Sequence, residues 1–466
     1  MHRNRSKKHL LNSLLPAVFM LFAASACTLH AQETHTPQST IQTPVKLTLP
    51  DAISLALEHN RDVQVAAKDI DDAEARIKEV YGRAYPQLNG NVSYTRNIEL
   101  PVLFIPPNTP FNPSPKAQKF EMGLKNDVVA GVSASQVLFD PQLNTGIQIA
   151  KRYRNYAELS SDSKQEEIVR DVKIAFYAVL LSERLVDVAR QSVELAQAHY
   201  DNIKAHYDQG TAAEFDLLRA EVQLANARPQ LSRQENGLAL SKDNLKLKIG
   251  LEPQQQLDII GNLAVEAAPE TDTESDIDNL IASNTMIRAL KAQEAMLEKN
   301  ISIENAAYFP VLSAFANYNY QAQDNSLNIG DYEWVNTFMA GLTLSVPLFN
   351  GFQTKHRVAQ ARIGMDRAVL SRMQIEDGIR LALDQAKLDL KEAKERYDAL
   401  AQSVGQAHRA VDIADVRFRS GVGTQLEVLD SQTALAQTES EQALAAFDYF
   451  AALAEWEKLT SSMREN

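Results

Sequence analysis

Residues 172–210 read VKIAFYAVLLSERLVDVARQSVELAQAHYDNIKAHYDQG and carry a sustained seven-residue pattern. They belong to a run of 66 residues, 144–209, that contains no proline and only one glycine. Mainly apolar side chains recur in two rows, three and four positions apart, which is the signature of a long helix in a coiled coil. At about 1.5 Å per residue, such a helix would be roughly 100 Å long. The rows consist of Val172, Val179, Val186, Val193, Tyr200 and Tyr207, and of Ile168, Ala175, Ser182, Ala189, Ala196 and Ile203.

The same pattern occurs again 211 residues later in the chain. Both copies end in a tight turn with a glycine, Gly210 in the first and Gly421 in the second, and a returning helix follows each turn. An Ala- and Leu-rich composition alone would not repeat both the turn and the heptad phase. The sequence therefore predicts an internal duplication of a helical hairpin. The second rows consist of Leu383, Leu390, Tyr397, Val404, Val411 and Phe418, and of Ile379, Ala386, Ala393, Leu400, Ala407 and Ala414.

The first 31 residues differ from the rest of the chain. Four basic residues precede a mostly apolar segment, 10–24, which is too short for a membrane helix and is followed by small residues. This order predicts a secretory signal peptide over 1–31. Two interpretations of its end stay open: cleavage after Ala31, which removes the only cysteine, or a lipoprotein signal that leads to lipidation of Cys27. Neither leaves a disulfide in the mature chain.

The charge balance excludes one class of partner. The chain has 47 basic and 60 acidic residues, a net charge of −13, and loss of residues 1–31 would bring it to about −17. So acidic a protein, with no basic stripe, is a poor nucleic-acid binder.

Strand patterns lie between the predicted helices. Segments 87–97 and 122–138 alternate apolar and polar residues, and two similar segments lie between Pro310 and Leu348. Strands of about 10–14 residues with one apolar face suit a membrane-spanning sheet. Four strands cannot close on themselves, and an open edge in lipid leaves backbone groups unpaired. Closure therefore requires several chains, and three chains would give 12 strands.

These patterns predict two similar halves joined by a linker. After the signal peptide, the first repeat covers 32–250, with a helix over about 49–83, a β-hairpin over 86–138 and a long helical hairpin over 141–249. The linker covers 251–275. The second repeat covers 276–466, with a helix over about 276–307, a β-hairpin over 310–348 and a helical hairpin over 351–460. Residues 101–115, six of which are proline, are expected to form an irregular loop.

Residues 47–460 closely resemble the TolC-like outer-membrane efflux and export channels. The features that carry the resemblance are the repeated helix–hairpin–long helix–turn–helix order, the strand-to-helix switches Leu138-Phe-Asp140 and Leu348-Phe-Asn350, and the turns 210–216 and 421–430. Each motif is weak alone, and together they are specific.

The resemblance implies a fold, a function and partners. The fold is mainly α with a small transmembrane β part: a long antiparallel coiled-coil helical barrel that crosses the periplasm, and a 12-stranded β-barrel shared by a homotrimer in outer-membrane lipid. The function is a passive exit duct of a tripartite efflux or type I secretion system. The implied partners are a periplasmic adaptor and an inner-membrane transporter of the RND, ABC or MFS type.

The resemblance also implies roles for residues at the helical turns. Gly210, Thr211, Gly421 and Gly423 would form the tip that docks the adaptor. Gly423 stands where a well-known member has an arginine that pairs across the closed gate, so that lock is missing here. The acidic residues that would form the periplasmic gate and its constriction are Asp216, Glu427 and Asp430.

The residues leave one alternative function open and argue against another. A coiled-coil scaffold of the periplasm or cell surface, without channel activity, would share the helical pattern. An enzyme is not expected, because the chain lacks a nucleophile elbow, an HExxH motif and phosphate-binding glycine loops, and no cofactor or metal is expected either. His199 and His206 lie seven residues apart without a further ligand, and we expect both to be surface histidines.

Overall fold

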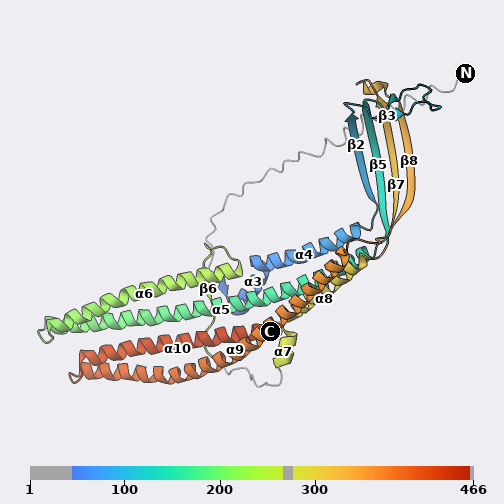
Figure 1. Ribbon diagram of the computed structural model, residues 1–466. Helices are drawn as coiled ribbons and strands as arrows, with labels where there is room; N and C mark the ends of the chain where they lie inside the picture. The colour runs from blue at the N-terminus through green and yellow to red at the C-terminus, as the bar shows by residue number, and fades with distance from the viewer. Residues whose placement is uncertain (1–44, 266–276, 462–466) are drawn as a thin grey trace. The chain divides into compact units, whose positions relative to one another are not determined.

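The computed structural model describes residues 45–265 and 277–461 (Figure 1). The expected signal peptide, Cys27 and the second part of the expected linker lie outside the described residues. The same order of elements occurs twice: a pair of helices, a β-hairpin, a long helix and a returning helix. In the first half the elements are β1 (Val45–Leu47), α3 (Leu49–His59), α4 (Arg61–Gly82), β2 (Gln87–Arg96), β3 (Val102–Ile105), β4 (Gln118–Glu121), β5 (Asn126–Phe139), α5 (Pro141–Asp208), α6 (Glu214–Ile249) and β6 (Leu257–Ile259). In the second half they are α7 (Ile277–Ser283), α8 (Thr285–Ala306), β7 (Val311–Asp324), η1 (Ile329–Asp331), β8 (Trp334–Ser345), α9 (Gln353–Arg419) and α10 (Gln425–Leu459).

The long helix α5 contains 68 residues and begins where the strand pattern ends. Asp140 has an extended backbone, and its side chain accepts a hydrogen bond from the Gln142 amide, which caps the helix. Pro141 occupies the first turn, where its missing N–H is not needed. The helix packs against α3, α4, α6, α8 and α10, so it buries more than one face.

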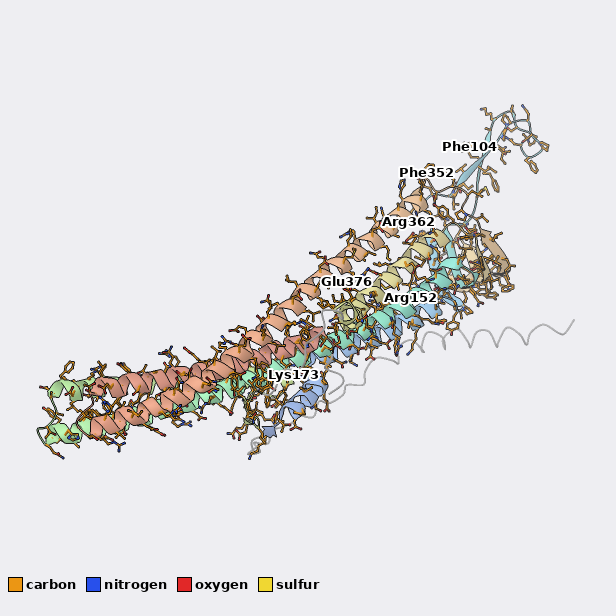
Figure 2. All side chains as sticks on the ribbon, turned by 90° about the horizontal axis from the view of Figure 1, so that it is seen from below. Phe104, Arg152, Lys173, Phe352, Arg362 and Glu376 are labelled. Atoms are coloured by element: carbon orange, nitrogen blue, oxygen red, sulfur yellow. The ribbon has the colours of Figure 1, made fainter. Side chains whose placement is uncertain are left out.

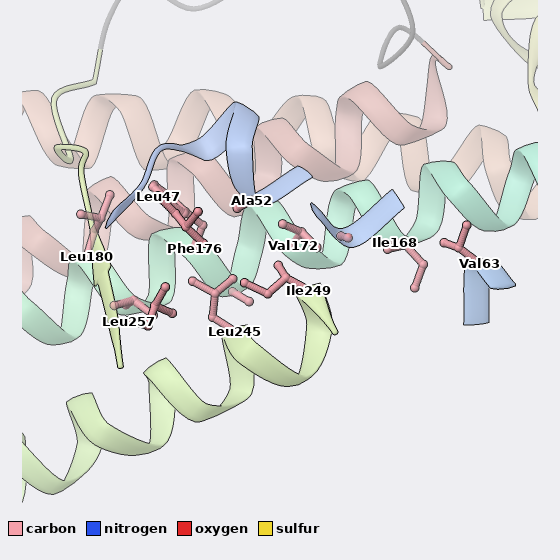
Figure 3. Close-up of a cluster of buried hydrophobic side chains, with 13 residues drawn as sticks. Leu47, Ala52, Val63, Ile168, Val172, Phe176, Leu180, Leu245, Ile249 and Leu257 are labelled. Carbon is pink, nitrogen blue, oxygen red and sulfur yellow. The ribbon is translucent and has the colours of Figure 1, made fainter. Parts of the chain in front are cut away.

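The predicted heptad rows supply much of the buried surface of α5. Val172 and Val179 are fully buried, and Ile168 is 2% exposed. Towards the turn the first row becomes less buried, and Tyr207 is 39% exposed. Around Val172, the helix forms a core with the ends of α3 and α6 and with the short strands β1 and β6 (Figure 3). That core also includes Phe176, which belongs to neither predicted row and is 2% exposed.

Each helix predicted before a β-hairpin consists of two helices. The pattern predicted continuous helices over about 49–83 and 276–307, whereas the backbone is interrupted at Asn60 and at Asn284. Both asparagines are buried, and each side chain accepts hydrogen bonds from the first amides of the following helix. Each side-chain amide also donates to the end of a returning helix: Asn60 to the Lys248 carbonyl (2.7 Å) and Asn284 to the Leu459 carbonyl (2.9 Å). The continuous helices were therefore a wrong prediction, because these caps compete with helix continuation.

Four antiparallel strands form one sheet in the order β2-β5-β7-β8, and their lengths of 10, 14, 14 and 12 residues match the prediction. The register gives the sheet one mainly apolar and one mainly polar face. Cross-strand neighbours on the apolar face include Gly90, Val132, Tyr318 and Phe338. A polar row is formed by Asn91, Gly131, Asn319 and Thr337.

The proline-rich connection between β2 and β5 contains regular structure, contrary to the expectation for residues 101–115. Strands β3 and β4 pair there as a small antiparallel hairpin, with Val102 opposite Glu121. Pro229 lies within α6, which continues through it. Within residues 45–265 and 277–461, no helix has an apolar stretch long enough to span a membrane.

Ion pairs connect the two halves of the chain beside the core of Figure 3. Arg170 on α5 bonds Glu455 on α10 at 2.8 Å and Asp171 at 2.6 Å, and Lys248 on α6 reaches Asp171 at 2.7 Å. Burial raises the pKa of Asp171, but the hydrogen bonds from Lys248 and Arg170 outweigh this effect and hold that pKa below its ordinary value. The network therefore fixes α10 and α6 to α5 at the level where the returning helices end.

Candidate functional site

The first helical turn, between α5 and α6, is closed by a Schellman motif. The Thr211 amide donates to the His206 carbonyl (2.8 Å), and the Gly210 amide donates to the Tyr207 carbonyl (2.9 Å). Gly210 has a φ of +72°, the left-handed conformation that glycine adopts without penalty. The Thr211 hydroxyl adds a second bond to the His206 carbonyl at 2.9 Å. The backbone of this turn is thus satisfied internally, and Gly210 has open space where a Cβ would lie.

The second turn, between α9 and α10, has the same construction. The amides of Val422 and Gly421 donate to the carbonyls of Arg417 (3.1 Å) and Phe418 (3.0 Å), and Gly421 has a φ of +73°. Gly423 differs, because a Cβ there would lie 2.9 Å from the Cβ of Arg417 and from the Phe418 amide nitrogen. Glycine at 423 therefore permits a close backbone approach, and a side chain would push the turn open.

The acidic residues of the expected gate lie just after these turns. Glu427 and Asp430 are both exposed and lie three residues apart on α10, on the side opposite to the buried Val428. The structure brings Glu427 to Arg417, whose Nε lies 3.3 Å from the carboxylate. Sequence reasoning considered an arginine only at position 423 and missed Arg417 at the end of α9. Asp216 lies in the first turn of α6 and is half-buried.

A glutamine that sequence reasoning also missed connects the two turns. Gln425, at the start of α10, is 7% exposed, and its side-chain amide donates to the backbone carbonyl of Asp216 at 3.2 Å. The bond links the beginning of α10 to the beginning of α6, so the two helical hairpins touch close to their turns. No sequence signal identified it, because the acceptor is a backbone atom.

His199 is buried, which contradicts the expectation of a surface histidine. The residue is 7% exposed, its ring lies 5.5 Å from the Phe418 ring on α9, and its Nε2 has no hydrogen-bond partner. Burial lowers the pKa of His199 below its ordinary value, so the neutral ring is favoured. His206 is exposed as expected, and its Nδ1 lies 3.1 Å from the Thr211 hydroxyl. Across the described parts of the chain, no three His, Cys, Asp or Glu side chains are arranged to hold a metal ion.

The class of protein follows from comparison of this chain with known families. A family model described as "Outer membrane efflux protein" matches residues 52–251 and 277–461, which is most of the chain. The chain therefore belongs to the outer membrane efflux protein family.

Individual relatives agree with this assignment. The outer membrane protein TolC of Vibrio cholerae is 22% identical over 342 residues, which cover 72% of this chain and 77% of that protein. The probable outer membrane lipoprotein SilC of Salmonella typhimurium is 20% identical over 399 residues, which cover 83% and 80% of the two chains. Among solved structures, the outer membrane channel CmeC of Campylobacter jejuni has the same fold, with a TM-score of 0.70, 16% identity and coverage of 88% of this chain and 85% of that one.

The protein is accordingly an efflux channel in the outer membrane of a Gram-negative bacterium, with its helical part in the periplasm. Members of this family are channels and transporters and not enzymes. This assignment favours the exit duct over a coiled-coil scaffold without channel activity.

Proposed function

We propose that three copies of the chain form a passive exit duct that receives its substrates from an inner-membrane transporter through a periplasmic adaptor. The observation that carries the proposal is the pair of open sheet edges, since β2 and β8 each pair on one side only among the described strands. An edge strand in lipid leaves backbone groups unpaired, so β2 of one copy must pair with β8 of the next. Two copies would form a barrel of 8 strands, and side chains fill the interior of a barrel of that size. Three copies would form a barrel of 12 strands, which leaves a passage.

The helices support the same head-to-tail arrangement. In the single chain, α6 packs on α5 and α3, and α9 packs on α7, α8 and α10. Both α6 and α9 therefore have a side that no other described helix covers. Contact between these sides would close a ring of identical interfaces. Exposed apolar residues on α6 are Phe215, Leu218, Val222, Leu240 and Leu247, and on α9 they are Ile363, Leu370, Met373, Leu381, Leu388, Ile413 and Val416.

The two turns provide the proposed adaptor site. Gly210 and Gly421 present exposed backbone with no side chain, and Thr211 and Gly423 complete the two turns. Backbone exposed at a glycine permits close approach of a partner helix. The transporter is of the RND, ABC or MFS type, and the system is a tripartite efflux or type I secretion assembly.

The acidic residues form the proposed constriction. In a trimer, Glu427 and Asp430 place rings of carboxylates near the turns, and Asp216 adds a further ring. Like charges gathered in a narrow passage attract cations. The pairing of Arg417 with Glu427 partly neutralises the negative charge of the Glu427 ring. Asp430 forms no ion pair within the described chain, so its ring should attract cations more strongly.

Single-channel recording in planar bilayers tests this proposal. The wild-type channel should prefer cations, and trivalent cations should block it from the periplasmic side. Glu427→Ala/Asp430→Ala should lose both properties, and salt should weaken the wild-type preference because screening shortens to about 8 Å near physiological ionic strength. Glu221→Ala/Glu235→Ala removes the same charge from exposed positions on α6 and serves as the control. If the protein formed no pores, the proposed duct would be contradicted. If the Glu427/Asp430 variant kept the wild-type selectivity and block, the proposed constriction would be contradicted.

A further inference from the structure

The connection between β2 and β5 carries an apolar hairpin that the chain itself leaves exposed. It consists of β3 and β4 with the intervening residues, 102–121, and includes Leu103 (51% exposed), Phe104 (62%), Phe111 (86%) and Phe120 (60%). Figure 2 shows Phe104 well away from Lys173 on α5, beyond the ends of the helices. In the hairpin register Leu103 lies opposite Phe120 on one face, and Phe104 lies opposite Lys119 on the other. Each face therefore carries exposed apolar side chains of the kind that mark interaction sites. The 102–121 hairpin is therefore a candidate interaction surface.

This hairpin is ordered before any partner binds. Asn112 is fully buried, and its side-chain amide donates to the carbonyls of Ile105 (3.2 Å), Pro106 (3.3 Å) and Lys116 (2.9 Å). Its side-chain oxygen accepts from the Ser114 amide at 3.1 Å. A loop fixed in this way pays little ordering entropy on binding. It is built as a rigid docking element.

A second ordered loop, 325–333, connects β7 to β8 at the same end of the sheet. Asn126 is fully buried and donates to the carbonyls of Asp324 (3.1 Å) and Ser326 (2.6 Å), while its oxygen accepts from the Tyr94 hydroxyl (2.9 Å). The loop presents Leu327 (68% exposed) and Ile329 (52%) to the outside. It is thus a fixed platform with its own apolar surface.

The positions of these two loops relative to the open edges indicate what covers them. The 102–121 hairpin follows the outer end of β2, and the 325–333 loop precedes the outer end of β8, and these are the two strands with a free edge. When β2 of one copy pairs with β8 of the next, the two loops come together across that seam. Their net charges are opposite: the hairpin exposes Lys116, Lys119 and Glu121, and the platform exposes Asp331 and Glu333.

We infer that the 102–121 hairpin of each copy clasps the 325–333 loop of the next copy, locking the seam between protomers at its outer end. The occupant is a second copy of this chain. The inference rests on the proposed assembly of several copies, but it can fail while that assembly stands. Lipid and the hairpin's own chain are the alternative occupants.

Cross-linking between copies tests the clasp. Phe104→Cys/Ile329→Cys is made in a Cys27→Ser background, because Cys27 is the only cysteine in the sequence. With a short bismaleimide reagent, the detergent-extracted protein should shift on denaturing gels from the mass of one chain to the masses of two and three chains. Phe104→Cys/Leu240→Cys, which pairs the hairpin with an exposed position on α6, is the matched control and should stay at the mass of one chain.

A second readout separates the remaining occupants. Phe104→Trp, made in a Trp334→Phe/Trp456→Phe background, should keep its fluorescence in vesicles of brominated phosphatidylcholine if another protein copy covers it. Quenching by that lipid, or a cross-link formed only within one chain, would overturn the clasp. The native mass of the same samples is measured in parallel. Trimers without the cross-link contradict the clasp alone, whereas monomers contradict the proposed function as well.

Discussion

Gly210 and Gly421 set the conformation of both turns at the scale of single residues. Each lies in the left-handed region, at φ +72° and +73°, and each has open space around the missing Cβ. A side chain would therefore meet backbone strain and no steric clash. For residues other than glycine and asparagine, this conformation costs roughly 1–2 kcal/mol.

Because the cost is backbone strain, substitutions at the turns should differ according to whether the new residue tolerates the left-handed conformation. Gly210→Val and Gly421→Val should abolish export, because a β-branched residue forces the backbone out of the turn that is proposed to dock the adaptor. Gly210→Asn keeps the left-handed conformation and should retain more export than Gly210→Val. Export by a strain that depends on this channel is the readout, with native mass to show that assembly persists. Gly405→Val, in open space within α9, is the control. Full export by both valine variants would place docking elsewhere.

His199 links the same region to pH. Its pKa is lowered by burial, so the folded state binds the proton less readily than the unfolded chain does. The stability of the folded state is therefore complete above the ordinary pKa of 6.5 and falls as the pH drops below it. Each pH unit costs up to about 1.4 kcal/mol until the folded-state pKa is reached.

Thermal unfolding at pH 8 and pH 5 measures this effect. His199→Leu keeps an apolar side chain against Phe418 and removes the titration, so its melting temperature should fall less on acidification than that of the wild type. His206→Leu changes an exposed histidine and should behave as the wild type does. An identical acid shift in the wild type and His199→Leu would show that other groups carry the pH dependence.

At the scale of elements, Asn60 and Asn284 show why the sequence could not give every boundary. Apolar periodicity continues across both positions, so it predicts one helix where there are two. The break depends on acceptors in the returning helices, the carbonyls of Lys248 and Leu459, which lie 188 and 175 residues away. The long helical hairpin, by contrast, was predicted to begin at residue 141 and to turn at Gly210, and α5 is observed over Pro141–Asp208, since heptad rows and a proline-free run are local signals.

Removing either asparagine should loosen the joint between a helix pair and its returning helix. Asn284→Ala loses a helix cap and leaves the Leu459 carbonyl without its partner, which together should cost about 1–3 kcal/mol. Asn236→Ala, at an exposed position within α6, should be neutral. Chemical denaturation of both variants measures the difference. Equal stability of Asn284→Ala and Asn236→Ala would contradict the role given to this cap.

The site was less predictable than the fold for a similar reason. The glycines at the turns and the carboxylates just after them were predicted from the resemblance to the family, and the repeat places Asp216 and Glu427 at corresponding positions. An arginine was considered only at position 423, where a close backbone approach disfavours a side chain. The ion pair of Glu427 with Arg417 was not predicted. Gln425 and His199 act through groups contributed by the other hairpin, and such contacts leave no mark in a local pattern. Ordering of the proline-rich 102–121 hairpin by Asn112 is of the same kind.

At the scale of the whole molecule, the chain is an incomplete unit. Its sheet has two open edges, and its helices α6 and α9 expose apolar side chains that no described part of the chain covers. In the proposed assembly further copies would cover both, and three copies would be the smallest number that leaves a passage through the strands. Copy number is thus the claim on which the duct, the constriction and the clasp all depend.

Native mass spectrometry of the detergent-extracted protein tests that claim most directly. The account predicts one dominant species at three times the mass of the mature chain, which dissociates to single chains on heating in denaturant. A preparation that contains only monomers or dimers, while remaining folded and bound to detergent, would contradict the account.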